Sequence, residues 1–146
     1  LPWPVESFVG KADLWHFPDY LLLPTLSGRT ILTIHDLSFL VMPQFAHRKL
    51  QQFLAKAVPR SARRADHLIA DSESTRRDMV RIWGLPEERI SVVYCGVDRR
   101  FHPVQDRELL DRVRRKYALP ERFFLFVGKI EPRKNLTGLI RIFTRL

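Results

Sequence analysis

The sequence predicts an α/β protein built on parallel strands. Short apolar segments alternate along the chain with longer segments whose apolar residues recur at helical spacing, and turn residues separate the two kinds. The segment Phe123–Val127 is apolar at all five positions, which is typical of a central parallel strand covered on both faces. Because 45% of the residues are hydrophobic and 28% are charged, the composition is that of a globular protein.

Five segments have the character of strands. The clearest is Thr30–Ile34, whose β-branched and apolar residues suit a buried strand better than a short helix. The others are similar short runs in the alternating pattern. We therefore expect strands over Ala12–His16, Thr30–Ile34, His67–Ala70, Ile90–Tyr94 and Phe123–Val127.

The first long helix is predicted from His47 onward, because five apolar residues follow at helical spacing and share one face. Proline removes an interior hydrogen bond, so Pro59 should kink or end this helix. The five residues of the apolar face are Leu50, Phe53, Leu54, Ala57 and Val58.

Three more helices are expected. In the first, Asp71–Ser74 supplies N-cap residues, which explains Ser72 better than a nucleophilic role does, and Gly84 provides a stop. The second contains Leu109 and ends near Pro120, and the third begins at Leu136. Strands alternating with helices in this way indicate a parallel sheet covered by helices.

The charge of the chain favours anionic partners. Its 25 Lys and Arg residues outweigh 16 Asp and Glu, giving a net charge of +9, which suits nucleic acids, acidic lipid surfaces or phosphorylated small molecules. The single cysteine, Cys95, can form neither an internal disulfide nor, alone, a structural zinc site, which favours the reducing cytoplasm. No run approaches the roughly 20 apolar residues that a spanning helix needs.

The loop after the last expected strand has the features of a phosphate site. In open α/β sheets, ligands bind where loops leave the carboxyl ends of strands. Gly128 permits a sharp turn or a close ligand, and Asn135 can cap the following helix, whose N-terminus attracts anions. Three cations surround that terminus, namely Lys129, Arg133 and Lys134. A solvated basic turn, with Glu131 paired to Arg133, explains the same residue types equally well.

Four motifs that follow one another along the chain together closely resemble family 4 glycosyltransferases, the retaining enzymes with two Rossmann-like domains (GT-B). The segment Val127–Leu136 resembles the first strand–loop–helix of that family's C-terminal domain. The other matching segments are Thr33–Leu37, which holds the strand-end His motif, Ala65–Asp78, and Arg89–Pro103, which resembles the interdomain connection. One departure lies at Tyr94–Cys95, where the family usually has Pro-Asn.

The resemblance implies parts of two Rossmann-like domains with parallel sheets. Residues 1–103 would be the second half of the N-terminal, acceptor-side domain plus the linker, and residues 104–146 the truncated start of the C-terminal, nucleotide-sugar-binding domain. The chain opens without an initiator Met and closes inside a helical pattern, which fits an internal piece. The family's Gly-rich loop and Glu-x7-Glu element are both absent, so we expect this piece alone to be inactive.

The resemblance also assigns roles residue by residue. Lys129 and Lys134 map to cations that contact the donor diphosphate, in a loop that also holds Gly128 and Arg133. His35 maps to a histidine beside the donor sugar and acceptor, and is the expected catalytic residue, although a structural histidine that caps a loop would occupy the same place. The expected loop-shaping residues are Asp36, Glu131 and Asn135.

The function implied is transfer of a hexose, with retention, from a nucleotide-sugar to a glycan or lipid-linked acceptor. GDP-mannose is the first expectation for the donor, and other GDP-, UDP- or dTDP-sugars stay open; no cofactor and no metal are expected. Basic residues on and after the long helix add a possible contact of a cytoplasmic protein with anionic membrane. The alternative is a basic nucleic-acid-binding module, against which stands the absence of any stacking surface or RNA-binding signature in the sequence.

Overall fold

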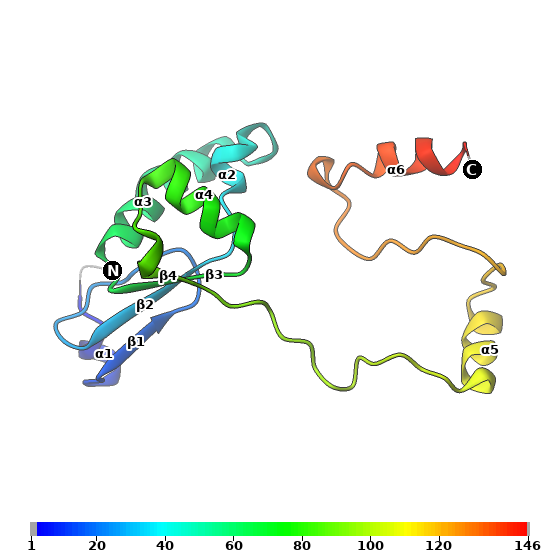
Figure 1. Cartoon of the computed structure of the whole chain (residues 1–146), viewed down its shortest axis with the longest axis horizontal. Coiled ribbons are helices and arrows are strands. Elements are labelled where there is room, and N and C mark those ends of the chain that lie inside the picture. Colours follow the sequence, from blue (N-terminus) through cyan, green and yellow to red (C-terminus); the bar gives the residue numbers. More distant parts are fainter. Residues whose placement is uncertain (1–2, 146) are drawn as a thin grey trace. The chain divides into compact units, whose positions relative to one another are not determined.

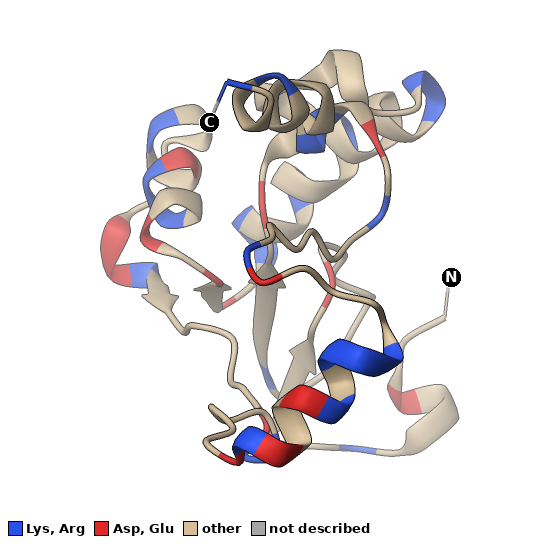
Figure 2. Ribbon diagram, turned by 90° about the vertical axis from the view of Figure 1, so that its right-hand side faces the viewer, with Lys and Arg blue, Asp and Glu red and all other residues tan. Residues whose placement is uncertain are grey.

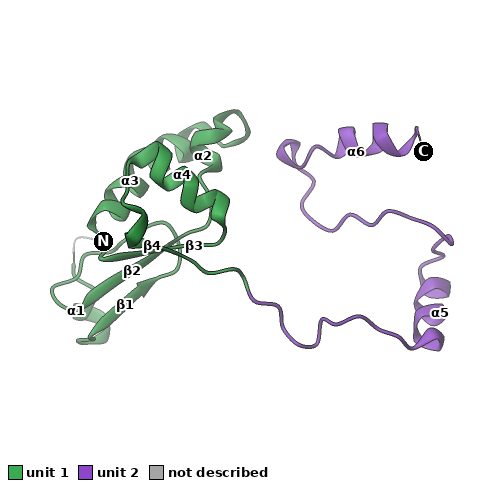
Figure 3. Cartoon of the chain, in the orientation of Figure 1, with its two compact units in different colours: residues 1–95 green, residues 96–146 purple. Residues whose placement is uncertain are grey.

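A computed structural model describes residues 3–145 of the chain and divides it into two units (Figures 1 and 3). The first unit is Leu1–Cys95 and the second is Gly96–Leu146. The units divide inside the segment that resembles the interdomain connection, and the predicted domain boundary at residue 103 stays a prediction.

The first unit is built on a four-stranded parallel sheet. Its strands are paired in chain order, so that each strand is a neighbour of the next. This arrangement confirms the predicted α/β class, although β1 begins and ends slightly later, and β4 ends earlier, than the sequence suggests. The strands are β1 (Leu14–Phe17), β2 (Arg29–Ile34), β3 (His67–Ala70) and β4 (Ile90–Val92).

Helices α2, α3 and α4 lie together on one side of this sheet (Figure 1). The side chains with almost no exposed surface come from the strands, from the β2–α2 turn and from α3 and α4; the largest are Leu32, Ile34, Leu37, Leu68, Met79 and Val58. The helical segments of the unit are α1 (Glu6–Val9), α2 (Ser38–Val41), η1 (Pro43–Phe45), α3 (Arg48–Arg64), α4 (Glu73–Trp83) and η2 (Glu87–Arg89).

Helix α3 does not end at Pro59, contrary to one of the two outcomes expected for it, and continues to Arg64. A proline removes one backbone hydrogen bond, at a cost that buried neighbours can offset. Here Val58 and Ala62, on either side of the proline, are fully buried. Nearer the start of the helix the apolar face is not buried, since Leu50 and Phe53 are each 54% exposed.

Helix α4 begins and ends as its sequence predicts. The hydroxyl of Ser72 accepts a hydrogen bond from the backbone N–H of Thr75 at 3.1 Å, which caps the first turn. At the other end Gly84 takes the left-handed conformation, with φ 65°, that commonly stops a helix.

The second unit corrects one prediction. Its elements are α5 (Arg107–Lys116), η3 (Pro132–Lys134) and α6 (Leu136–Phe143), and the expected strand Phe123–Val127 is extended but unpaired. A strand exists only with a hydrogen-bonded neighbour, and the described part of this unit contains no second strand to pair with. The five apolar residues are therefore exposed, Val127 the most at 83%.

Candidate functional site

Polar side chains meet at the carboxyl edge of the sheet, where three neighbouring strands end. Asp19 follows β1, His35 follows β2 and Asp71 follows β3, each within two residues of its strand. Because all three strands are parallel and adjacent, their carboxyl ends lie at one edge. This is the edge at which open α/β sheets bind ligands.

The imidazole of His35 lies between two carboxylates. Its Nδ1 donates a hydrogen bond to Oδ2 of Asp71 at 2.6 Å, and its Nε2 lies 4.0 Å from Oδ1 of Asp19. The hydrogen bond to Asp71 raises the pKa of His35, partial burial opposes it, and the charges of both carboxylates add to the rise. The ring therefore holds its proton more tightly than a free histidine does.

Aromatic side chains support the same ring. The ring of Tyr20 packs edge-on against His35, with centroids 5.5 Å apart, and against Phe39 at 5.9 Å. Burial, with the charge of Asp36 nearby, raises the pKa of the Tyr20 phenol to about 12. The phenol is therefore neutral at physiological pH, and its oxygen accepts a hydrogen bond from the backbone N–H of Asp36 at 3.3 Å.

Asp36 lies at the start of the turn into α2. Its Oδ1 accepts a hydrogen bond from the backbone N–H of Ser38 at 2.8 Å. This contact is local to the loop, as an Asx-type turn requires. The geometry is compatible with the loop-shaping role expected for this residue.

The predicted phosphate loop lies in the second unit, between the extended segment and α6. Gly128 has φ 156°, and a side chain there would meet the ring of Phe126 at 3.1 Å. Asn135 adopts the left-handed conformation, with φ 50°, and its side-chain oxygen accepts a hydrogen bond from Gly138 N–H at 3.3 Å, capping α6. Asparagine is among the few residues that tolerate this backbone.

The three cations of that loop differ in whether they form an ion pair. Arg133 forms an ion pair with Glu131, 2.8 Å between Nη2 and Oε1. Neither Lys129 nor Lys134 has an ion pair among residues 3–145. The two lysines are thus the cations of the loop that stay available to a phosphate, while Arg133 is held by a carboxylate.

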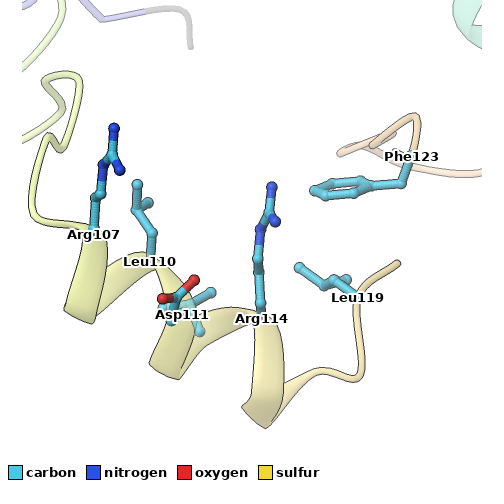
Figure 4. Close-up of a pocket in the computed structure, with 7 residues that line it drawn as sticks. Arg107, Leu110, Asp111, Arg114, Leu119 and Phe123 are labelled. Carbon is cyan, nitrogen blue, oxygen red and sulfur yellow. The ribbon is translucent and has the colours of Figure 1, made fainter. Parts of the chain in front are cut away.

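Most of the basic residues and the pocket along α5 lie outside the expected site. Lys and Arg are spread over several elements, α5 among them, where acidic residues are interspersed (Figure 2). An open, mostly apolar hollow lies along α5, with Arg114 across from Phe123 (Figure 4), and none of the expected site residues lines it.

The described residues contain neither a cluster of metal ligands nor a helix that could cross a membrane. Across residues 3–145, no three His, Cys, Asp or Glu side chains gather as a metal site would require. None of the described helices has the length and apolar character that crossing a bilayer demands.

Sequence reasoning identified His35 but missed Asp71 and Asp19. Asp71 was interpreted only as part of a capping sequence, and Asp19 was not singled out at all. A usable signal existed, since each aspartate comes directly after, or two residues after, a strand. What the sequence alone did not supply was the order of strands that makes them neighbours.

Comparisons with known proteins identify the family of the chain. Residues 6–101 match Glycosyltransferase Family 4. The chain is 26% identical over 145 residues, 99% of its length, to O-antigen chain mannosyltransferase B of Escherichia coli, and covers 37% of that protein. It is 28% identical over 120 residues to O-antigen chain mannosyltransferase RfbU of Salmonella typhimurium, covering 82% of this chain and 30% of that protein.

A further relative is named for a different substrate. A D-inositol 3-phosphate glycosyltransferase of Thermomonospora curvata is 37% identical over 82 residues, which are 53% of this chain and 19% of that protein. The chain spans about a third of the length of the two mannosyltransferases above. Nothing among these relatives supports the alternative of a nucleic-acid-binding module.

Proposed function

This chain belongs to glycosyltransferase family 4, and we propose that it is part of a retaining hexosyltransferase that uses a nucleotide-sugar. Two of the relatives are O-antigen chain mannosyltransferases, which favours mannose as the transferred sugar, and the donor we propose is GDP-mannose. The acceptor is a glycan or a lipid-linked glycan. The observation that carries the proposal is the position of His35 at the carboxyl edge of the sheet, between two carboxylates.

The chemistry divides between the units. Transfer breaks the bond from the sugar's anomeric carbon to a diphosphate oxygen and forms a bond to an acceptor hydroxyl, whose proton is released. The leaving diphosphate gains negative charge, which fixed cations and a helix N-terminus stabilise. In the second unit Lys129, Lys134 and the first turn of α6 would meet that charge, and in the first unit His35 would hydrogen-bond the sugar.

The test compares the 146-residue chain with the protein made from the complete reading frame that contains it. We expect the complete protein to transfer mannose from GDP-mannose to a mannose-bearing glycan with retained configuration, followed by NMR of the product. The 146-residue chain, which spans only a third of its relatives, should give no product. A complete protein that is inactive over a panel of GDP-, UDP- and dTDP-sugars would overturn the proposal.

The same protein is proposed to touch an anionic membrane surface from the cytoplasmic side. Residues 37–65 contain no Asp or Glu and include six cations, namely Arg48, Lys49, Lys56, Arg60, Arg63 and Arg64. Five exposed apolar side chains lie in the same segment: Val41, Met42, Phe45, Leu50 and Phe53. Exposed apolar groups flanked by cations suit the interface of an anionic bilayer, where each cation adds about 1 kcal/mol.

Vesicle co-sedimentation tests this contact. The chain should sediment with vesicles containing phosphatidylglycerol and not with pure phosphatidylcholine. The double variant Lys49→Gln/Lys56→Gln should weaken binding, whereas Arg112→Gln/Arg115→Gln on α5, which removes the same charge, should weaken it less. Equal sedimentation with both kinds of vesicle, or equal losses in both variants, would exclude a contact through α3.

A further inference from the structure

Asp71 lies beside His35 because of the register between β2 and β3. In that ladder each β2 residue is opposite the residue 36 positions later, as in Ile31 with His67 and Ile34 with Ala70. The same offset, continued by one residue, brings His35 opposite Asp71. The carboxylate is an acceptor only, so the 2.6 Å contact fixes a proton on Nδ1 of the imidazole.

We propose that Asp71 is the positioning residue of the His35 site, holding the imidazole with Nδ1–H toward β3 and so fixing Nε2 as the ring nitrogen that a ligand would meet. The inference rests on the proposed function and names a residue that acts through His35. The Asp71 side chain is 25% exposed and that of His35 is 43% exposed, so the ring is accessible while its partner is more enclosed.

The backbone of His35 is also held by a hydrogen bond. The hydroxyl of Thr75, in the first turn of α4, donates a hydrogen bond to the backbone carbonyl of His35 at 3.0 Å. The segment after β3 therefore fixes both the backbone and the ring of His35, the residue directly after β2. The 4.0 Å from Nε2 to Asp19 exceeds hydrogen-bond distance, so this nitrogen stays free of that carboxylate.

A fixed tautomer decides what His35 can do. When the ring is neutral, Nδ1 carries the proton and Nε2 can accept a hydrogen bond from a sugar hydroxyl. When the ring is protonated, Nε2 donates instead. The charged and titratable groups around the ring are the carboxylates of Asp71, Asp19 and Asp36 and the phenol of Tyr20.

The chain supplies a matched control at the other end of the same strand. Asp66 precedes β3 and accepts hydrogen bonds from the backbone N–H and the hydroxyl of Thr30, both at 2.8 Å, at the same offset of 36 residues. It ties β3 to β2 as Asp71 does, but at the amino edge, away from His35. Asp66→Asn therefore removes a strand-tying carboxylate without touching the imidazole.

The direct test is ¹⁵N NMR of the histidines in the full chain. In Asp71→Asn we expect the pKa of His35 to fall and the fixed Nδ1–H tautomer to be lost, while His16, His47, His67 and His102 serve as internal references. Asp66→Asn should leave the tautomer and pKa of His35 as they are. Asp71→Glu should restore the tautomer in part. If the pKa and tautomer of His35 are unchanged in Asp71→Asn, while circular dichroism shows that the chain is folded, the proposal is overturned. If Asp71→Asn unfolds the chain, Asp71→Glu takes its place. A raised pKa of His35 in Asp71→Glu then supports the proposal, and an ordinary pKa contradicts it.

The complete protein supplies the functional arm. There Asp71→Asn should lower kcat/KM by about 10²-fold, the usual effect of a misplaced group, and move the pH profile, whereas Asp66→Asn should move neither. If His35 responds in the NMR experiment but the parent protein transfers no sugar, the proposed function fails and the positioning role stands. If the parent is active and His35 does not respond, the positioning role fails alone.

Discussion

Truncating a leucine on β3 tests where the core of the first unit lies. Leu68 has no exposed surface and is opposite Leu32 on one side and Ile90 on the other. The change Leu68→Ala removes three carbon groups, worth about 0.8 kcal/mol each in transfer, or about 2.4 kcal/mol together. The cavity left behind adds to this, so we expect the free energy of unfolding to fall by about 3 kcal/mol.

Leu50 is the matched control because it is the same residue type on the apolar face of α3, yet 54% exposed. Leu50→Ala should change stability by no more than about 0.5 kcal/mol, as surface substitutions do. All three tryptophans, Trp3, Trp15 and Trp83, belong to the first unit, so their fluorescence during urea unfolding follows that unit. A loss below about 1 kcal/mol for Leu68→Ala, or equal losses for both variants, would refute the described core.

Three other predictions concern a cap, a phenol and a cation. Ser72→Ala should cost about 1 kcal/mol of stability in urea unfolding, because it removes the cap of α4, and a neutral result would mean that the hydroxyl contributes no cap. The pKa of Tyr20 is raised from 10.0 to about 12, so the stability that the neutral phenol contributes is complete below pH 10 and is lost as the pH rises from 10 to 12. In Tyr20→Phe the melting temperature should therefore fall less steeply over that pH range, and an unchanged slope would contradict this. In the complete protein, Lys134→Ala should raise the barrier to transfer by about 2–4 kcal/mol, measured as kcat, and Arg133→Ala less; unchanged kinetics would remove Lys134 from the site.

The features that depend on residues close together in the sequence were predicted correctly. The strand His67–Ala70 was predicted at its observed bounds, as were the cap at Ser72 and the stop at Gly84. In each case the deciding residues lie within a few positions of the feature they determine. The parallel sheet followed from the alternation of strands and helices, because that pattern has few other solutions.

The failures concern features that depend on distant residues. Phe123–Val127 has every property of a buried strand except a partner, which no local pattern can supply. The apolar face of α3 was visible in the sequence, but its spacing did not reveal that Leu50 and Phe53 would stay exposed. Asp71 was hidden for the same reason, since its pairing with His35 needs the strand register.

The two carboxylates that bracket β3 make residues 66–71 an indivisible block for recombination. An insertion at an exposed turn of the connection between His35 and Asp66, such as that at His47, leaves both pairings in register. An insertion within His67–Ala70 would shift Asp71 relative to Asp66, so that only one of the two could still meet its partner, Thr30 for Asp66 and His35 for Asp71. Chimeras between members of this family should therefore carry this hexapeptide, the β2 strand and His35 together from a single parent.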